Sequence, residues 1–179
     1  MSASGAAEAT NKLDTVLATF REPGEDASPP ATDALISAAE QTLGVRLPAL
    51  MRRLLREQNG GRVSDQWNAF RLRDPAWDED WASLSELMGI DPDAELSILD
   101  TPYLTREWDL PAQLLLLDGD GHRWVALDYR DCGPHGEPSV AYFETDTGTS
   151  QPVAPDFGAF LETLCPESTV NDEELDPAR

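Results

Sequence analysis

The turn Asp118-Gly119-Asp120-Gly121 constrains the fold of this chain more than any other feature. It stands between two largely apolar runs, Gln113 to Leu117 and Arg123 to Leu127. Asp-Gly pairs provide the backbone conformations that tight hairpin turns require, and apolar runs on both sides of such a turn pair as strands. The sequence therefore predicts a β-hairpin at this point.

Helices are predicted before the hairpin. Leu13, Val16, Leu17 and Phe20 recur at helical spacing, which indicates an amphipathic helix over about residues 10–20. A second helix is expected after a cap at Thr32 or Ser28, with Gly44 as its left-handed end. The third is expected to begin at Pro48 and to end at Asn59-Gly60-Gly61.

Shorter elements complete the pattern. Their expected positions are a strand over Trp67 to Leu72, a short helix over Trp81 to Met88, a strand over Ser139 to Phe143, a turn at Asp146-Thr147-Gly148, and a last helix from Asp156 through Leu164. Glu95 to Asp100 fits either a helix or a strand. Helices followed by antiparallel strands and a closing helix, without alternating strand–helix repeats, predict an α+β fold.

One domain is expected over residues 10–165, with a flexible N-terminus over 1–9. From Pro166 onward the chain has too little apolar surface to offset the entropy of ordering, so residues 166–179 are predicted to be a disordered acidic tail.

The charge of the chain limits the classes of partner that it is expected to bind. Its 34 acids face 13 bases, which gives a formal net charge of −21. Nucleic acid should be repelled, because phosphate binding needs clustered cations. The same field would steer a basic protein, such as a nuclease, toward this chain, although charge that serves solubility alone is equally compatible with the composition. Like-charged surfaces repel each other, so a monomer or a weak dimer is expected.

Two cysteines, Cys132 and Cys165, indicate no disulfide framework and fit a reducing compartment. The first residues lack a cationic segment followed by an apolar run, and the longest purely apolar run is Leu114 to Leu117. We therefore expect a cytoplasmic protein without an export signal or a membrane span.

Two blocks of residues carry a family resemblance. The run from Ala39 through Leu43-Gly44 to Leu47-Pro48, followed by Asn59-Gly60-Gly61, resembles the opening signature of the SUKH superfamily. In that signature one helix ends at Leu-Gly, Leu-Pro starts the next, and Asn-Gly-Gly closes it. Residues 108–130, from Trp108-Asp109-Leu110-Pro111 to Tyr129-Arg130, together with Pro138 and Val140, are similar to its central sheet, and residues 157–164 resemble its closing helix.

The resemblance covers about residues 32–164. It implies N-terminal helices packed on a central antiparallel sheet, and a protein-binding role without enzymatic activity. The superfamily includes the yeast cell-wall assembly regulator and bacterial immunity proteins that neutralise polymorphic or contact-dependent toxins. The resemblance therefore favours a toxin-immunity protein, with an intracellular regulatory or scaffolding protein as the alternative. The insert at about residues 74–100 and the acidic tail depart from the family pattern.

That insert is the first candidate interface. It holds nine acids and no Lys or Arg between Asp74 and Asp100. Trp77 and Trp81 lie among these acids at helical spacing, which suits interface anchors that select a basic partner, although both rings could equally face the core. The candidate partner-binding residues are Trp77, Asp78, Glu79, Asp80, Trp81, Asp118, Asp120 and Tyr129.

A basic stretch precedes the insert. Seven arginines between Arg46 and Arg73 face only Glu57 and Asp65. We expect these arginines to serve as intramolecular partners of the acidic insert, because several fall on the polar side of the third helix.

Metal, cofactor and catalytic sites are not expected. Asp118-Gly119-Asp120-Gly121 resembles the start of a calcium loop but lacks its later ligands, and Cys132 with His135 is half of a zinc set. The chain has no nucleophile elbow, phosphate loop or dinucleotide motif, and only two histidines. A carboxylate pair such as Asp118 and Asp128 gives no reason to prefer a hydrolase.

Overall fold

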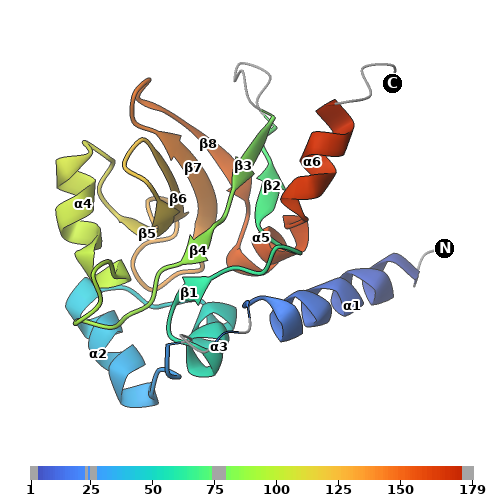
Figure 1. The fold of residues 1–179 in the computed structure, drawn as a ribbon. Coiled ribbons are helices and arrows are strands. Elements are labelled where there is room, and N and C mark those ends of the chain that lie inside the picture. Colours follow the sequence, from blue (N-terminus) through green and yellow to red (C-terminus); the bar gives the residue numbers. More distant parts are fainter. Residues whose placement is uncertain (1–3, 23, 25–27, 74–79, 175–179) are drawn as a thin grey trace.

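Helices form one layer of the protein and an antiparallel sheet forms the other, as a computed structural model of the chain shows (Figure 1). The structure describes residues 4–22, 24, 28–73 and 80–174. The first elements are α1 (Ser4–Thr19), α2 (Asp33–Leu43), α3 (Ala49–Glu57), β1 (Gly61–Arg62), β2 (Ala69–Arg71), β3 (Trp81–Ser83) and β4 (Glu86–Leu87). They are followed by η1 (Ile98–Asp100), α4 (Thr101–Glu107), β5 (Leu114–Gly119), β6 (Arg123–Asp128), β7 (Ser139–Glu144), β8 (Thr149–Ala154), α5 (Phe157–Thr163) and α6 (Glu167–Glu174).

The N-terminal helices confirm the sequence prediction. The Thr32 hydroxyl caps α2 by accepting a hydrogen bond from Leu35 N at 3.2 Å, and Gly44 ends the helix with a φ of 68°. The first helix begins at Ser4 instead of near Thr10, because its start is rich in alanine, the strongest helix former. Within the described ranges, no helix combines the length and the apolar composition needed to span a bilayer.

The predicted hairpin is also confirmed, and it starts the sheet β5-β6-β7-β8. The Asp120 carboxylate closes its turn by accepting hydrogen bonds from the backbone N–H groups of His122 and Arg123, both at 2.9 Å. A Cβ atom on Gly119 would lie 2.2 Å from the Trp124 ring, so only glycine fits there. The register shifts between Leu116 and Asp118, which marks a β-bulge in β5.

The prediction of a helix over Trp81 to Met88 is wrong. This segment forms β3, which pairs with β2, and β4, which pairs with β1. Buried Ala82 and Leu84 alternate with exposed Ser83 and Ser85, which is the period of a strand. Pairing with strands distant in sequence therefore overrides the helical spacing of the apolar residues.

Helix α4, strand β8 and helix α6 are absent from the prediction, and η1 is the helical turn within Glu95 to Asp100, which fitted either a helix or a strand. A capping box between Ser97 and Asp100 starts η1, and Pro102 follows in the first turn of α4. Strand β8 tolerates Pro152 because it lies at the edge of the sheet. Helix α6 occupies part of the segment predicted to be a disordered tail, where Glu167 N donates to Asn68 Oδ1 at 2.9 Å and Val170 is buried.

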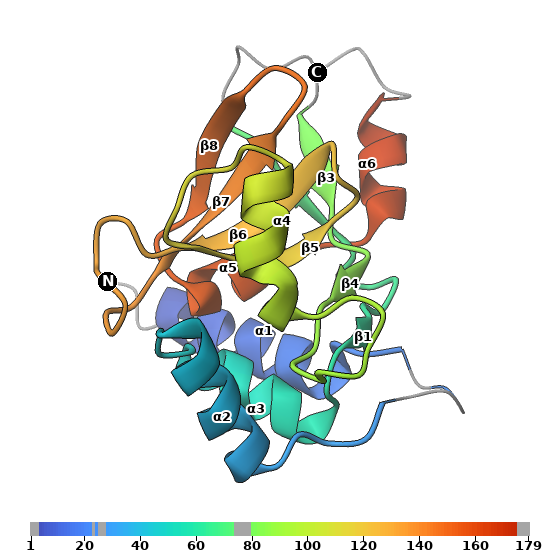
Figure 2. The same cartoon turned by 90° about the vertical axis from the view of Figure 1, so that its left-hand side faces the viewer.

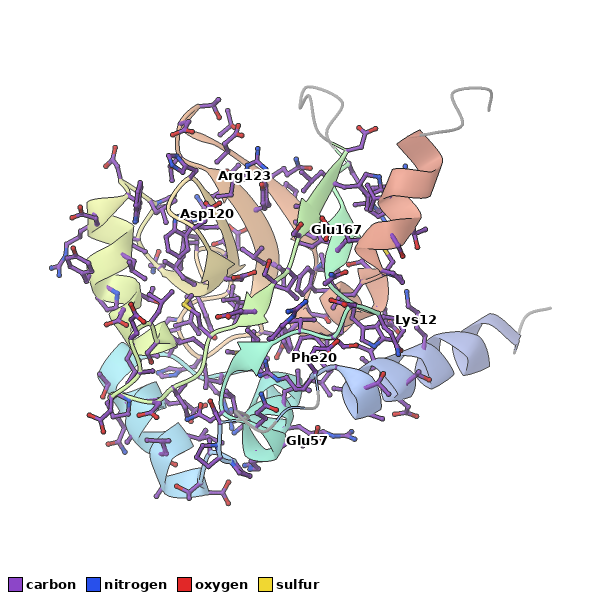
Figure 3. The ribbon with its side chains drawn as sticks, viewed as in Figure 1. Lys12, Phe20, Glu57, Asp120, Arg123 and Glu167 are labelled. Atoms are coloured by element: carbon purple, nitrogen blue, oxygen red, sulfur yellow. The ribbon has the colours of Figure 1, made fainter. Side chains whose placement is uncertain are left out.

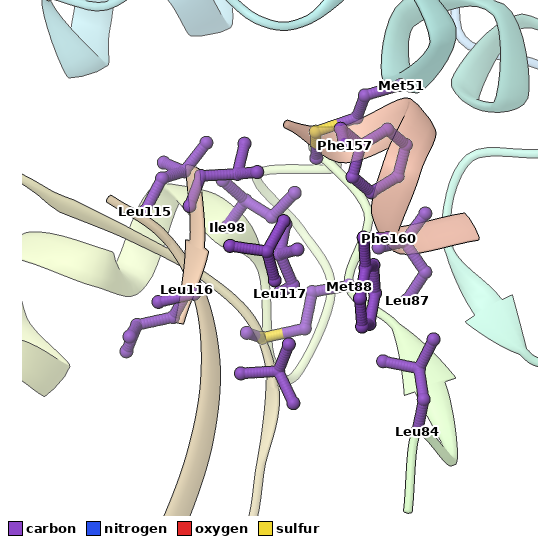
Figure 4. Close-up of a cluster of buried hydrophobic side chains, with 14 of the residues drawn as sticks. Met51, Leu84, Leu87, Met88, Ile98, Leu115, Leu116, Leu117, Phe157 and Phe160 are labelled. Atoms are coloured by element: carbon purple, nitrogen blue, oxygen red, sulfur yellow. The ribbon is translucent and has the colours of Figure 1, made fainter. Parts of the chain in front are cut away.

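The core lies where the two layers meet. Helix α5 contacts α1 and α3 on one side and β7 and β8 on the other. Figure 4 shows its Phe157 and Phe160 beside Met51 of α3 and Leu87 of β4. On the opposite side of the sheet α4 packs against β5 (Figure 2). This arrangement is the predicted α+β fold, with N-terminal helices, an antiparallel sheet and a closing helix.

Replacing Phe70 with alanine tests this core. The Phe70 ring is fully buried and makes edge contacts with Tyr142 and Phe160, at centroid distances of 6.1 and 5.2 Å. We expect Phe70→Ala to lower the free energy of unfolding by about 3–5 kcal/mol in urea denaturation. Tyr103→Ala, which truncates a ring that is 57% exposed, should change it by less than about 0.5 kcal/mol. Equal effects of the two substitutions would contradict the packing described.

Candidate functional site

The structure disperses the residues predicted to bind a partner. Trp77, Asp78 and Glu79 lie outside the described residues. Asp80 is exposed at the start of β3, and its carbonyl accepts a hydrogen bond from Leu72 N at 2.7 Å. The Trp81 ring is half-buried and carries the Arg71 guanidinium at 4.7 Å from its centroid. One face of Trp81 is thus already covered from within the protein.

Within the described residues, the arginine-rich stretch has partners both in the insert and outside it. Arg71 contacts the insert through Trp81. Three other arginines pair with acids outside the insert: Arg53 with Glu57, Arg56 with Asp33, and Arg62 with Asp65. These pairs are exposed and contribute little to stability.

A hollow of about 470 Å³ opens between the β3–β4 segment and the β5–β6 hairpin. Its polar lining includes Glu86 of β4, Asp118 of β5, Asp120 of the turn and Arg123 of β6. Figure 3 shows Asp120 and Arg123 together at this end of the hairpin. Met88, Leu96 and Val125 add apolar wall. The hollow thus combines carboxylates with apolar surface, which suits a side chain that has both characters.

A second hollow, of about 580 Å³, adjoins the first. The two share Glu86, Met88 and Leu96, and the second adds Asp91 and Glu95. We call the two hollows together the acidic groove. Its acids are Glu86, Asp91, Glu95, Asp118 and Asp120, and Arg123 is the cation of its lining. Leu96 lines both hollows and is 41% exposed, so it offers apolar surface to the groove.

Asp118 joins β5 to the β4 segment at the groove. Its Oδ2 accepts hydrogen bonds from Ser85 N at 2.7 Å and from Glu86 N at 3.3 Å. Beside it, the carbonyl of the bulge residue Leu117 accepts one from Met88 N at 2.8 Å. Burial raises the pKa of Asp118 to about 6, against the opposing effect of these amides. The groove therefore contains a carboxylate that titrates near neutral pH.

Asn59 supports the groove from the helical layer. Its Oδ1 accepts a hydrogen bond from Ile90 N at 2.8 Å, in a buried position. Gly60 and Gly89 make this approach possible, since a Cβ atom on Gly60 would lie 2.6 Å from Gly89 N. Ser97 then donates to the Gly89 carbonyl at 3.0 Å. The Asn-Gly-Gly motif thus fixes the path of the chain along the second hollow.

Two further predicted residues have structural roles. Tyr129 is 1% exposed, and its hydroxyl donates to the Arg46 carbonyl at 2.7 Å. Asp120 closes the hairpin turn and also lines the first hollow. Asp118 and Asp120 therefore meet at one site, whereas Trp81 and Tyr129 are not among the residues that line the groove.

The sequence analysis did not identify Leu96 or Arg123 as candidate site residues. It noted Glu86, Asp91 and Glu95 only as part of the acidic insert. The charge of the insert was a signal for the three acids. No local sequence pattern identifies Leu96 or Arg123. They line the same groove because β1 pairs with β4 and because β5 contains a bulge, and both features depend on contacts between distant segments.

Two arrangements weighed from the sequence concern metal ligands and the carboxylate pair Asp118 and Asp128. No three metal-binding side chains converge in the part of the chain that is described. The carboxylates of Asp118 and Asp128 are engaged separately, the first by the Ser85 and Glu86 amides and the second by Arg130 at 2.6 Å.

Comparison with known families gives one match. The family model described as SMI1 / KNR4 family (SUKH-1) matches residues 30–163, from the loop before α2 to the end of α5. No curated protein matches the chain.

Replacing Asp118 with asparagine should change how stability depends on pH. The folded pKa of about 6 lies above the ordinary value of 3.8, so the fold disfavours the charged form. The associated cost is absent below pH 3.8 and complete above about pH 6. Asparagine still accepts hydrogen bonds but cannot ionise. We expect wild type to lose stability relative to Asp118→Asn as pH rises from 4 to 7, by up to about 3 kcal/mol in urea denaturation at each pH. A difference that does not vary with pH would contradict the raised pKa.

Asn59→Ala tests the contact beneath the second hollow. The substitution leaves the buried Ile90 N–H without its acceptor, so we expect the free energy of unfolding to fall by about 1–3 kcal/mol. Asn68→Ala is the matched control, because Asn68 Oδ1 accepts an N–H from Glu167 in an exposed setting. A thermal or urea melt should show a smaller loss there, below about 1 kcal/mol.

Proposed function

Because the chain belongs to the SMI1 / KNR4 family (SUKH-1), we propose that it acts by binding another protein and is an immunity protein that neutralises a cognate bacterial toxin. This family is associated with protein–protein interaction and includes toxin-immunity proteins. The proposal includes a cytoplasmic location, where an incoming toxin would meet its inhibitor, and direct occlusion of the toxin without catalysis.

The acidic groove is the observation that carries this proposal. Five carboxylates and one arginine line it, in a chain whose net charge is −21. A toxin that acts on nucleic acid has a basic surface, because it must hold phosphates. Complementary potentials raise the rate of encounter and select against acidic partners. We therefore propose a basic toxin domain, such as a nuclease, as the partner.

Short-range contacts would determine how long the complex lasts. Leu96 offers exposed apolar surface between the two hollows, with Met88 beside it. Apolar contacts at the centre of an interface, surrounded by charges, mainly slow dissociation. The groove has both kinds of surface, because Met88 and Leu96 line both hollows and five acids complete the lining.

The test is co-purification from the native host with this protein as bait at moderate salt, followed by mass spectrometry and a toxicity-rescue assay. We expect capture of a basic toxin domain whose lethality this protein suppresses. Capture of proteins without toxicity, and no rescue by co-expression, would overturn the immunity role and favour a regulatory or scaffolding protein.

Neutralising the groove should weaken toxin binding. We expect the triple variant Glu86→Gln, Asp91→Asn, Glu95→Gln to reduce affinity by about tenfold or more in surface plasmon resonance, mainly through slower association at low salt. The control variant Glu107→Gln, Asp131→Asn, Glu137→Gln removes the same charge from exposed positions that do not line the groove. If both variants lose affinity equally, net charge and not the groove drives binding.

A further inference from the structure

The first hollow differs from its neighbour in its lining by Asp118 and Asp120 of the hairpin and by two aromatic residues. Three carboxylates reach it from different segments: Glu86 from β4, Asp118 from β5 and Asp120 from the hairpin turn. The cation of the lining, Arg123, has its Nε 4.0 Å from Glu144 Oε1. The remaining wall includes apolar side chains and buried aromatic residues, Trp124 and Tyr142. The local excess of negative charge therefore lies against an apolar surface.

From this combination we propose that the first hollow is the seat of an arginine side chain of the partner, held by Glu86, Asp118 and Asp120. The assignment rests on the proposed function, because the arginine belongs to the basic toxin. A guanidinium fits better than an ammonium group, since it is planar, weakly hydrated, able to bond two carboxylates at once and able to lie on apolar or aromatic surface. A lysine ammonium would lose more hydration on entering a hollow with apolar walls.

The position of Asp118 should make the affinity of this hollow for a cation depend on pH. Burial places the pKa of Asp118 at about 6, and an arriving cation favours its ionised form. Near pH 5 most Asp118 carboxyls are protonated, so binding has to displace a proton. Affinity for the cation should therefore rise with pH, and the dissociation constant at pH 5 should be about tenfold higher than at pH 7.

Other charged groups face the same hollow. Glu86, Asp120 and Arg123 line it from β4, the turn and β6. His122 follows Asp120 in the turn, and its hydrogen bond to Asp146 raises the pKa of the imidazole. A protonated His122 would also weaken cation binding at low pH, so its contribution needs a separate variant.

The experiment uses the full chain and a blocked tetra-arginine peptide at 0.15 M salt, followed by NMR. The backbone amides of Ser85 and Glu86 report on Asp118, because both donate to its Oδ2. We expect saturable shifts of these two amides, a dissociation constant about tenfold higher at pH 5 than at pH 7, and weaker binding of tetra-lysine.

Two variants isolate the group responsible. Asp118→Asn should bind with little dependence on pH, while a thermal melt confirms that it is folded. His122→Asn should keep the pH dependence. Shifts spread over the whole acidic surface, equal affinity for tetra-lysine, or unchanged pH dependence in Asp118→Asn would each overturn the assignment. The peptide experiment does not involve the toxin, so its failure would count against the arginine site alone. Failure to capture a toxin from the host would count against the proposed function.

Discussion

The contact between the Asn59-Gly60 turn and the chain at Gly89-Ile90 holds the rest of the structure in place. A side chain on either glycine would collide with backbone atoms, at 2.6 Å in both cases. The close approach lets Asn59 Oδ1 accept a hydrogen bond from the buried N–H of Ile90, which lies after β4 and outside any helix or strand. Satisfying that donor fixes the end of α3 against the segment after β4. This buried hydrogen bond is thereby one of the links between the helical layer and the strands.

A second junction completes the groove. The β5 bulge turns Leu117 and Asp118 so that the carbonyl of one and the carboxylate of the other receive amides from residues 85–88. An asparagine could accept the same amides without the cost of burying a charge. An ionisable group at this position therefore reduces stability at neutral pH, which is a frequent property of binding sites. The junction supports the fold and places a carboxylate in the hollow at the same time.

How much the sequence predicts depends on how local each interaction is. Thr32, Gly44 and Asp120 act on backbone groups within four residues, so their helix ends and turn could be predicted from residue type alone. The segment from Ala82 to Leu87 could not, because its apolar spacing fits a helix and only pairing with β1 and β2 makes it two strands. The groove depends on that pairing. Its acids were visible as an excess of charge, whereas the side chains grouped around Asp118 were not.

Net charge and groove act over different distances. A charge of −21 attracts any basic protein, but its effect falls within about 10 Å at physiological salt, and it cannot distinguish one basic surface from another. Discrimination requires groups in fixed positions. Hydrogen bonds to backbone amides fix the carboxylates of Asp118 and Asp120, and β4 places the backbone of Glu86 beside the same hollow. A partner with a cation at the matching position would interact with all three, and one without it would cover these carboxylates without supplying an opposite charge, which is costly. Under the proposed function, selectivity therefore depends on the same strand pairings that form the fold.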